Sequence, residues 1–449
     1  MVIKQRFKEY SHSLAWQAVD ACFDGKWQRD DVLNFAEKYG GFCREALFGE
    51  ILDNNLTLRN EVTDSIAYFV DEMVECILNG KEIDEMEPVV TEQRPDGMTG
   101  KVREIANLCI PHQLLGHVVK LGLDEFLHAR ILPQQHASIP RHGQTMLKEQ
   151  MTRYLRSSSL DIRYVVKTDV KHAYGTTKYS SLIQIIEEEL PKAKWIIAAL
   201  RYLEKWAPDG HLIIGGYLDA WLFNLAMSYV IRDVLEQKTV RRGVEHRWVS
   251  RVSTYMDDFA LLGRTKTGLK KAIKYLDRRL HERFGMELKQ TSSILKIESM
   301  EEERERKKQK RPSKRGCNSV DMGGFMIHRS YVTMRPRVEK RVARAFSRAY
   351  EEYRITGTIQ KQRAQTLIAR YGSVVQTNSD GFKHKYHVDE VMKIAKKVTA
   401  YHARQRSKRN RRWMRGRYNK HKSTLERLEQ NESGGKEHVC NYQNALQAA

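Results

Sequence analysis

The sequence lacks any long apolar run. No uninterrupted apolar segment approaches the ~20 residues that a membrane-spanning helix needs. The first residues, Met1-Val2-Ile3-Lys4-Gln5-Arg6, also lack the apolar stretch of a signal peptide. From these two absences we expect a cytoplasmic protein with no membrane partner.

Cysteine is scarce, and its distribution argues against two common uses. The 449-residue chain has six cysteines without close pairs: Cys22, Cys43, Cys76, Cys109, Cys317 and Cys440. Zinc knuckles and disulfide scaffolds need closely spaced or regularly paired cysteines. The distribution therefore argues against both and fits a reducing compartment.

Acidic residues are too few to balance the basic ones. The sequence has 78 Lys and Arg against 56 Asp and Glu, which gives a formal net charge of +22 and a pI near 9.6. Such an excess attracts polyanions by counterion release and steers their approach. A membrane surface would attract it too. Without a spanning segment, nucleic acid is the partner that the composition favours, and the length allows several packed units.

The most informative segment is Tyr255-Met256-Asp257-Asp258. A strand-like run over 248–254 precedes it and an apolar run over 259–262 follows, which predicts a β-hairpin with two carboxylates at its tip. Adjacent carboxylates between apolar strands are costly unless a cation holds them, and a hard divalent metal with oxygen ligands suits them. Taken alone, the segment is better explained as a solvated Asp-Asp turn.

A second acid, Asp169, ends a β-branched run over 165–170 and precedes a helix-like stretch over 179–190. Phosphoryl-transfer enzymes with two metals bring carboxylates from separate elements onto ions about 4 Å apart. Asp169 on a strand and Asp257 on a hairpin would supply such a clamp. On its own, Asp169 is better explained as an acid in a turn at a strand end.

These segments resemble conserved blocks of reverse transcriptases. Tyr255–Asp258 resembles the catalytic hairpin, and Asp169-Val170-Lys171-His172-Ala173-Tyr174 the first catalytic motif. Further blocks follow in the family order: the fingers segments 101–103 and 138–143, the nucleotide-facing segment 214–219, the segment 285–289 and the primer-grip hairpin 321–327. The resemblance spans roughly residues 95–330. Within the family, the chain is similar to bacterial members of retron, diversity-generating or defence-associated type.

The resemblance implies a right-hand polymerase of the α/β (α+β) class, with fingers, an antiparallel-sheet palm and a helical thumb. The expected parts are a helical N-terminal extension (1–92), fingers (93–160), palm (161–335, with a charged insert over 300–318), thumb (336–402) and a basic, partly disordered tail (403–449). Helical spacing of apolar residues over 13–21, 31–39 and 61–78 indicates the extension's helices. The extension buttresses the fingers or, alternatively, binds a structured RNA.

The resemblance also assigns the metal ligands. It implies Mg²⁺, or Mn²⁺, held by Asp169, Asp257 and the backbone carbonyl of Val170, with Asp258 assisting. These acids are the catalytic residues expected for attack of a primer 3′-hydroxyl on a deoxynucleotide.

A lysine is expected to protonate the departing pyrophosphate, and Lys289 is the first candidate. The family lysine often lies nearer to position 292. Lys296 is the alternative.

Five residues are expected to bind the incoming nucleotide: Lys101, Arg103, Tyr174, Ile214 and Gly215. Arg103 is the preferred triphosphate ligand because guanidinium suits bidentate phosphate contact, and Lys101 is the second choice. Tyr174 resembles the aromatic steric gate that excludes a ribose 2′-hydroxyl, and Gly215 lets the backbone approach the nucleotide. Without the family frame, Arg103 and Lys101 are ordinary strand-edge charges and Tyr174 is a core tyrosine.

The chain departs from the family at two positions. Ile214 replaces the usual glutamine, as in diversity-generating enzymes, and an isoleucine packs but cannot hydrogen-bond. Asp219 replaces the usual serine. It fits an N-cap of the run 220–231, with nucleic-acid binding or solvent exposure as alternatives.

Further residues are expected to contact nucleic acid. They are Gly323, Gly324 and Phe325 of the primer grip, Arg341, Arg344 and Arg348 at helical spacing after Pro336, and Arg411, Arg412, Trp413 and Arg415 in a segment with no acid. The set Arg341, Arg344 and Arg348 is alternatively a solvated basic face. The charged insert over 301–315 is expected to be a mobile loop.

The function expected from the resemblance is RNA-directed DNA synthesis. Its partners are an RNA template, a DNA primer, dNTPs and a structured non-coding RNA of a defence or retroelement system. The alternatives are a catalytically silent RNA-binding protein on a polymerase scaffold, and a template-independent or protein-primed DNA polymerase.

Overall fold

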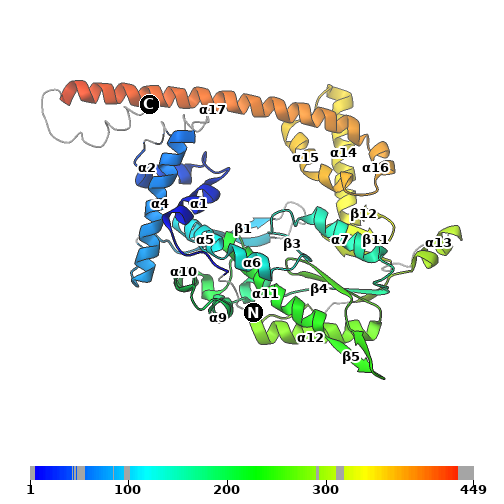
Figure 1. Cartoon of the computed structure of the whole chain (residues 1–449). Coiled ribbons are helices and arrows are strands. Elements are labelled where there is room, and N and C mark those ends of the chain that lie inside the picture. The colour runs from blue at the N-terminus through cyan, green and yellow to red at the C-terminus, as the bar shows by residue number, and fades with distance from the viewer. Residues whose placement is uncertain are drawn as a thin grey trace. The chain divides into compact units, whose positions relative to one another are not determined.

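The computed structural model describes residues 6–42, 44, 47, 56–83, 85–95, 102–289, 293–309 and 318–432. Over these residues the chain is a mixed α/β protein in which helices predominate and strands form four small sheets (Figure 1). None of the described helices is both long and apolar enough to cross a membrane. The chain divides into a larger unit (Met1–Phe7, Val89–Asn107 and Leu123–Ala400) and a smaller one (Lys8–Pro88, Leu108–Gly122 and Tyr401–Ala449).

The smaller unit is helical. Its main helices are α1 (His12–Phe23), α2 (Asp30–Gly40), α4 (Leu56–Leu78) and α5 (Ile110–Gly122). The three helices expected before residue 80 are confirmed, and each is longer than its apolar pattern indicated. Helix α5 joins them although it follows in sequence by thirty residues, because its buried face packs on α1.

A five-stranded sheet is the centre of the larger unit. Its order is β3-β7-β8-β4-β9, and only the β3–β7 pair is parallel. The strands are β3 (Gln135–His136), β7 (Arg251–Tyr255), β8 (Asp258–Gly263), β4 (Tyr164–Asp169) and β9 (Ile294–Lys296). The expected β7–β8 hairpin and β4 strand are confirmed, and they lie side by side.

Helices cover both faces of this sheet. Helix α7 (Gln144–Arg156) shares a core with Val165, Ala260 and Leu262. Alternate residues of the same strands face the other way, where α12 (Lys266–Phe284) contacts β4 and β8. The remaining helical elements here are α6 (Asp124–Arg130), α8 (Ala173–Thr176), α9 (Tyr179–Glu189), α10 (Lys194–Trp206), η1 (Pro208–Gly210) and α11 (Tyr217–Glu236).

Three smaller sheets complete the larger unit. They are the ribbon β1 (Val90–Pro95)–β2 (Val102–Asn107), the ribbon β5 (Lys238–Arg241)–β6 (Val244–Arg247), and a three-stranded sheet of β10 (Ser319–Met322), β11 (Phe325–His328) and β12 (Val332–Met334). The β10–β11 turn is Gly323-Gly324, with φ of +57° and +87°. Glycine tolerates this left-handed backbone without a Cβ penalty.

The C-terminal helices follow β12. They are α14 (Pro336–Thr356), α15 (Lys361–Val375), α16 (Asp380–Lys385) and α17 (Val388–Glu432). The three helices expected over 336–402 are confirmed, with the short α16 between the last two. The described part of the basic tail is helical to Glu432, because this stretch has no proline and is rich in helix-forming Lys, Arg, Gln and Glu. Residues 433–449 lie outside the described part.

The charged insert also differs from expectation. Residues Met300–Lys308 form helix α13 rather than a loop. Ser299 Oγ accepts a hydrogen bond from Glu302 N at 3.1 Å, and Glu302 Oε2 accepts one from Ser299 N at 2.7 Å. This reciprocal pair is a capping box, which starts a helix even in a highly charged segment. Residues 310–317 of the insert lie outside the described part.

Candidate functional site

The larger unit contains a cleft of about 1530 Å³. Its walls come from the β1–β2 ribbon, the segment after β4, the turn before α11, the β7–β8 tip, the β10–β11 turn and the start of α14. Of the residues predicted to bind metal, nucleotide or primer, those that line it are Arg103, Val170, Tyr174, Ile214, Gly215, Asp257, Asp258, Lys289, Gly323, Gly324 and Arg341. The lining residues run from Gln93 to Arg341, so segments far apart in sequence meet in one hollow.

Strand pairing brings Asp169 beside Asp257 and Asp258, which line the cleft. Asp169, the last residue of β4, pairs with Asp258, the first residue of β8. Asp257 precedes it in the two-residue turn, where Met256 has a φ of +52°. Val170 N donates to Asp257 O at 3.2 Å, which ties the hairpin tip to the end of β4.

Lysines neutralise two of these acids. Lys289 Nζ bonds Asp169 Oδ2, and Lys167 Nζ lies 3.2 Å from Asp258 Oδ1. No ion pair involves Asp257 among the described residues. Burial, and next the neighbouring Asp169 carboxyl, raise the pKa of Asp257 well above its ordinary value. Burial also raises the pKa of Asp258, against the opposing effect of Lys167.

The donor set fits a hard cation. Asp169 Oδ1 is buried without a hydrogen-bond partner in the described structure, and Asp257 beside it has no compensating charge. Oxygen donors with surplus negative charge suit Mg²⁺. Within the described residues no group of three or more His, Cys, Asp or Glu is arranged around a common point.

The position of Lys289 distinguishes it from Lys296, the alternative candidate for the proton donor. Lys289 N donates to Asp169 O at 2.8 Å, so its backbone is fixed beside the acids. Lys296 on β9 instead pairs with Glu302 and does not line the cleft. Position 292 lies outside the described residues. Of the two lysines, Lys289 alone is placed to act in this site.

Tyr174 forms part of the cleft wall. It follows β4 on the short helix α8, and its ring stacks on Phe223 of α11 with centroids 5.0 Å apart and planes 16° apart. Burial is the main cause that raises the pKa of Tyr174. A ring supported from behind in this way is a rigid surface and cannot yield easily to a bulkier ligand.

Of the two predicted triphosphate ligands, Arg103 lies on the β1–β2 ribbon. Arg103 is exposed on β2 and lines the cleft. Lys101 lies outside the described residues. Ala106 N donates to Ile214 O at 2.8 Å, which joins the ribbon to the turn before α11.

Asp219 is not the N-cap that its position suggested. Gly216 takes the N-cap position, and Asp219 is the third residue of α11, with an exposed fraction of 2%. It is neither exposed nor in the cleft lining, so a direct contact with nucleic acid is excluded in this arrangement. Burial raises the pKa of Asp219 to about 6. The capping rule considers only residues close in sequence, whereas the hydroxyl that donates to Asp219 belongs to Tyr179, forty positions away.

The predicted nucleic-acid contacts divide into three groups. Gly323 and Gly324 line the cleft, whereas Phe325 is buried in the core beneath them. Arg344 and Arg348 are exposed on α14 but do not line the cleft. Arg335 and Arg337, which the sequence analysis did not single out, do line it. Their only sequence signal is basic character on both sides of Pro336.

The last predicted set lies on α17. Arg412 and Trp413 are exposed there, Trp413 by 52%. The side chains of Arg411 and Arg415 lie outside the described part. These residues belong to the smaller unit, so they form a separate candidate surface.

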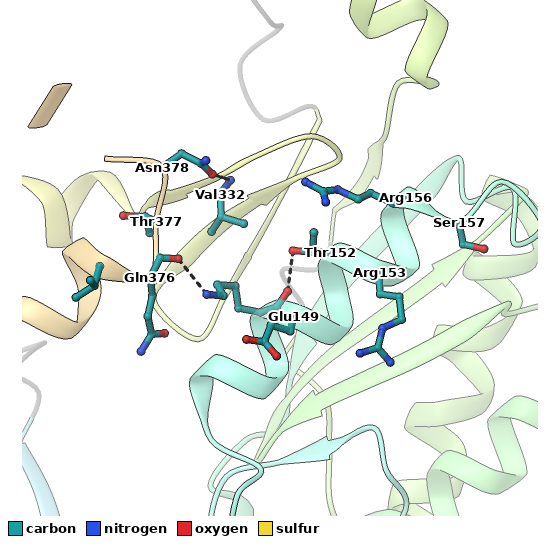
Figure 2. Close-up of a pocket in the computed structure, with 11 residues that line it drawn as sticks. Glu149, Thr152, Arg153, Arg156, Ser157, Val332, Gln376, Thr377 and Asn378 are labelled. Atoms are coloured by element: carbon teal, nitrogen blue, oxygen red, sulfur yellow. Dashed lines mark hydrogen bonds between the residues drawn. The ribbon is translucent and has the colours of Figure 1, made fainter. Parts of the chain in front are cut away.

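A second hollow of about 680 Å³ lies beside α7 (Figure 2). Two of its three cations already have partners: Lys148 Nζ donates to Gln376 O at 3.2 Å, and Arg156 donates to the carbonyls of Arg329 and Ser330. The third, Arg153, is exposed. Asn378 and Val332 exchange two further hydrogen bonds of 2.8 Å. These contacts join α7 and β12 to the end of α15. The hollow therefore lies where these elements are attached to one another.

No protein-family model matches the chain, and no curated protein is significantly similar to it.

Proposed function

We propose that the chain is an RNA-directed DNA polymerase of the right-hand type. In this proposal the β1–β2 ribbon and its neighbours are fingers, the five-stranded sheet with its helices is the palm, and α14, α15 and the first part of α17 are the thumb. One observation carries it: Asp257 lines a cleft that also contains Arg103 and Tyr174, and the Asp169 carboxyl, 88 positions away in sequence, lies beside it. Their order and spacing resemble reverse transcriptases.

Each residue has a task in this mechanism. Mg²⁺, or Mn²⁺, would be held by Asp169, Asp257 and the carbonyl of Val170, and supplies charge stabilisation at the phosphoryl oxygens. Arg103 orients the triphosphate by bidentate hydrogen bonds. Lys289 Nζ releases Asp169 and gives a proton to the departing pyrophosphate oxygen.

The cleft walls select the substrate. The Tyr174 ring, supported by Phe223, leaves no space for a 2′-hydroxyl, which favours deoxynucleotides. Ile214 contributes only packing, so base selection rests on pairing with the template rather than on a protein amide. The primer end would lie against Gly323-Gly324, where a Cβ built at Gly324 would meet no atom within 4 Å.

The proposed partners are an RNA template, a DNA primer, dNTPs and a structured non-coding RNA, in a bacterial defence or retroelement system. The basic stretch of α17 supports the last of these. It has no acid between Val391 and Leu425, and rings beside basic residues stack on unpaired bases.

A second candidate is a catalytically silent RNA-binding protein. The lysine contacts of Asp169 and Asp258 favour it, because they neutralise part of the acid set without a metal. The two candidates differ in a single measurable property, which is turnover.

Metal-dependent incorporation of labelled dNTPs on a primed RNA template tests the proposal. Asp257→Asn is expected to lower incorporation by about 10³-fold, since it removes the charge that the site holds uncompensated. Asp161→Asn, at an exposed acid paired with Arg163, is the matched control and keeps activity. Full turnover by Asp257→Asn, or no incorporation by the unmodified chain with Mg²⁺ and Mn²⁺, rejects the polymerase.

A further inference from the structure

The carboxylate of Asp219 holds a turn that lines the cleft. Its Oδ1 accepts hydrogen bonds from Ile213 N and from Tyr179 Oη, each at 2.9 Å. A buried carboxylate is costly unless its oxygens are hydrogen-bonded. These bonds therefore fix the segment 213–216 to α11 and to the start of α9.

Gly216 makes room for this carboxylate. A Cβ at that position would lie 1.8 Å from Asp219 Oδ2, and even its Cγ would be 2.6 Å away. No side chain other than hydrogen fits there while Asp219 keeps its place. The two residues are therefore matched to each other, which a solvated helix acid would not require.

The other side of the turn is attached to β2. Ile214 O accepts the hydrogen bond from Ala106 N, and Gly215, with φ of +111°, approaches so closely that a Cβ would lie 3.0 Å from Ala106 O. Arg103 lies three residues before Ala106 on the same strand. A continuous path of short contacts thus runs from Asp219 through the turn to the strand that carries Arg103.

We propose that Asp219 is a positioning residue. Through the turn 213–216 it sets where the β1–β2 ribbon, and with it Arg103, lies relative to Tyr174 and the acids. The inference rests on the proposed function, in which Arg103 binds the incoming triphosphate. An acid with only a stabilising role would change unfolding but leave nucleotide affinity untouched.

The test compares the KM for a dNTP with kcat, in parallel with equilibrium binding of a fluorescent dNTP analogue. Asp219→Ala is expected to raise KM and the Kd about tenfold, with kcat within about threefold. Asp219→Asn is expected to restore both, because an amide oxygen accepts the same bond from Ile213 N. Tyr179→Phe keeps the Ile213 bond and is the matched control with near-normal KM.

A double variant shows whether Asp219 acts through Arg103. If it does, Asp219→Ala adds little to the KM and Kd of Arg103→Ala, whereas independent effects multiply. Gly216→Ala displaces the carboxylate without removing it and serves as the second variant where Asp219→Ala fails to fold. Unchanged KM and Kd in folded Asp219→Ala or Gly216→Ala, or multiplying effects, overturns the inference. An unmodified chain that binds dNTP but incorporates none rejects the polymerase, and the Kd comparison then still decides the role of Asp219.

Discussion

Asp169 and Asp258 face each other as paired residues at the ends of the adjacent antiparallel strands β4 and β8. The pairing continues for five more residues, with Val165 and Leu262 in one core, so the hydrophobic pattern fixes the register. A slip of one residue would turn the apolar side chains of β4 to the wrong face. The core of the sheet therefore positions the acids, and Lys289 and Lys167 form ion pairs with two of them.

Replacing Lys289 tests how its ion pair with Asp169 affects metal binding and catalysis. In Lys289→Met the ammonium no longer competes for Asp169, so the Mg²⁺ concentration for half-maximal activity is expected to fall. The same change removes the proposed proton donor, and kcat is expected to fall about 10²-fold. Primer extension across a Mg²⁺ titration measures both. Lys296→Met is the control, since Lys296 pairs with Glu302 away from the cleft; equal losses in the two variants would argue against a role for Lys289.

Tyr174 is expected to set sugar selectivity. Tyr174→Ala removes the ring that stacks on Phe223, and the preference for dNTP over rNTP should fall about 10- to 100-fold. Tyr174→Phe keeps the ring and should keep the preference. The measurement is kcat/KM for matched dNTP and rNTP. An unaltered ratio in Tyr174→Ala assigns the ring to packing alone.

The elements of the site could be predicted more easily than their contacts. The β7–β8 hairpin was visible because two apolar runs flank an Asp-Asp pair, whereas its pairing with β4 joins residues 89 positions apart and has no local signal. Asp219 was misread for the same reason, since its hydroxyl donor lies on α9. The Ser299–Glu302 capping box, in contrast, is a local signal that was present in the sequence, and it accounts for the helix found where a loop was expected.

A buried arginine should contribute strongly to stability. Arg329, with an exposed fraction of 8%, donates to the carbonyls of Leu155, Ile162 and Glu298. Arg329→Met fills similar space but leaves these carbonyls without their donor, and should lower the free energy of unfolding by about 3 kcal/mol. Urea unfolding measures it. Arg163→Met, at an exposed ion pair, should cost less than about 1 kcal/mol, and similar losses in the two would contradict the assignment.

Two buried histidines should make the smaller unit sensitive to acid. Burial lowers the pKa of His112 to about 4 and of His117 to about 3. Below pH ~6.5 these histidines become protonated in the unfolded chain but stay neutral in the folded one. Stability is therefore lost as pH falls from ~6.5 toward 4, at about 1.4 kcal/mol per unit for each histidine. Amide hydrogen exchange in α5 at pH 7 and 5 measures this, and His112→Leu should weaken the dependence; an unchanged dependence in that variant assigns it elsewhere.

The exposed basic side chains of α17 should bind nucleic acid mainly through phosphates. Arg409 and Arg412 are exposed there, in a stretch without acids. Each phosphate contact contributes about 0.7 to 0.9 to the slope of log affinity against log salt. Replacing both with Gln should therefore reduce the slope by about 1.5 on single- or double-stranded RNA, and weaken binding regardless of sequence. The same exchange at Lys192 and Lys194, exposed in the larger unit, should leave the slope unchanged. If both pairs reduce the slope equally, the attraction comes from net charge, and α17 is an ordinary solvated helix.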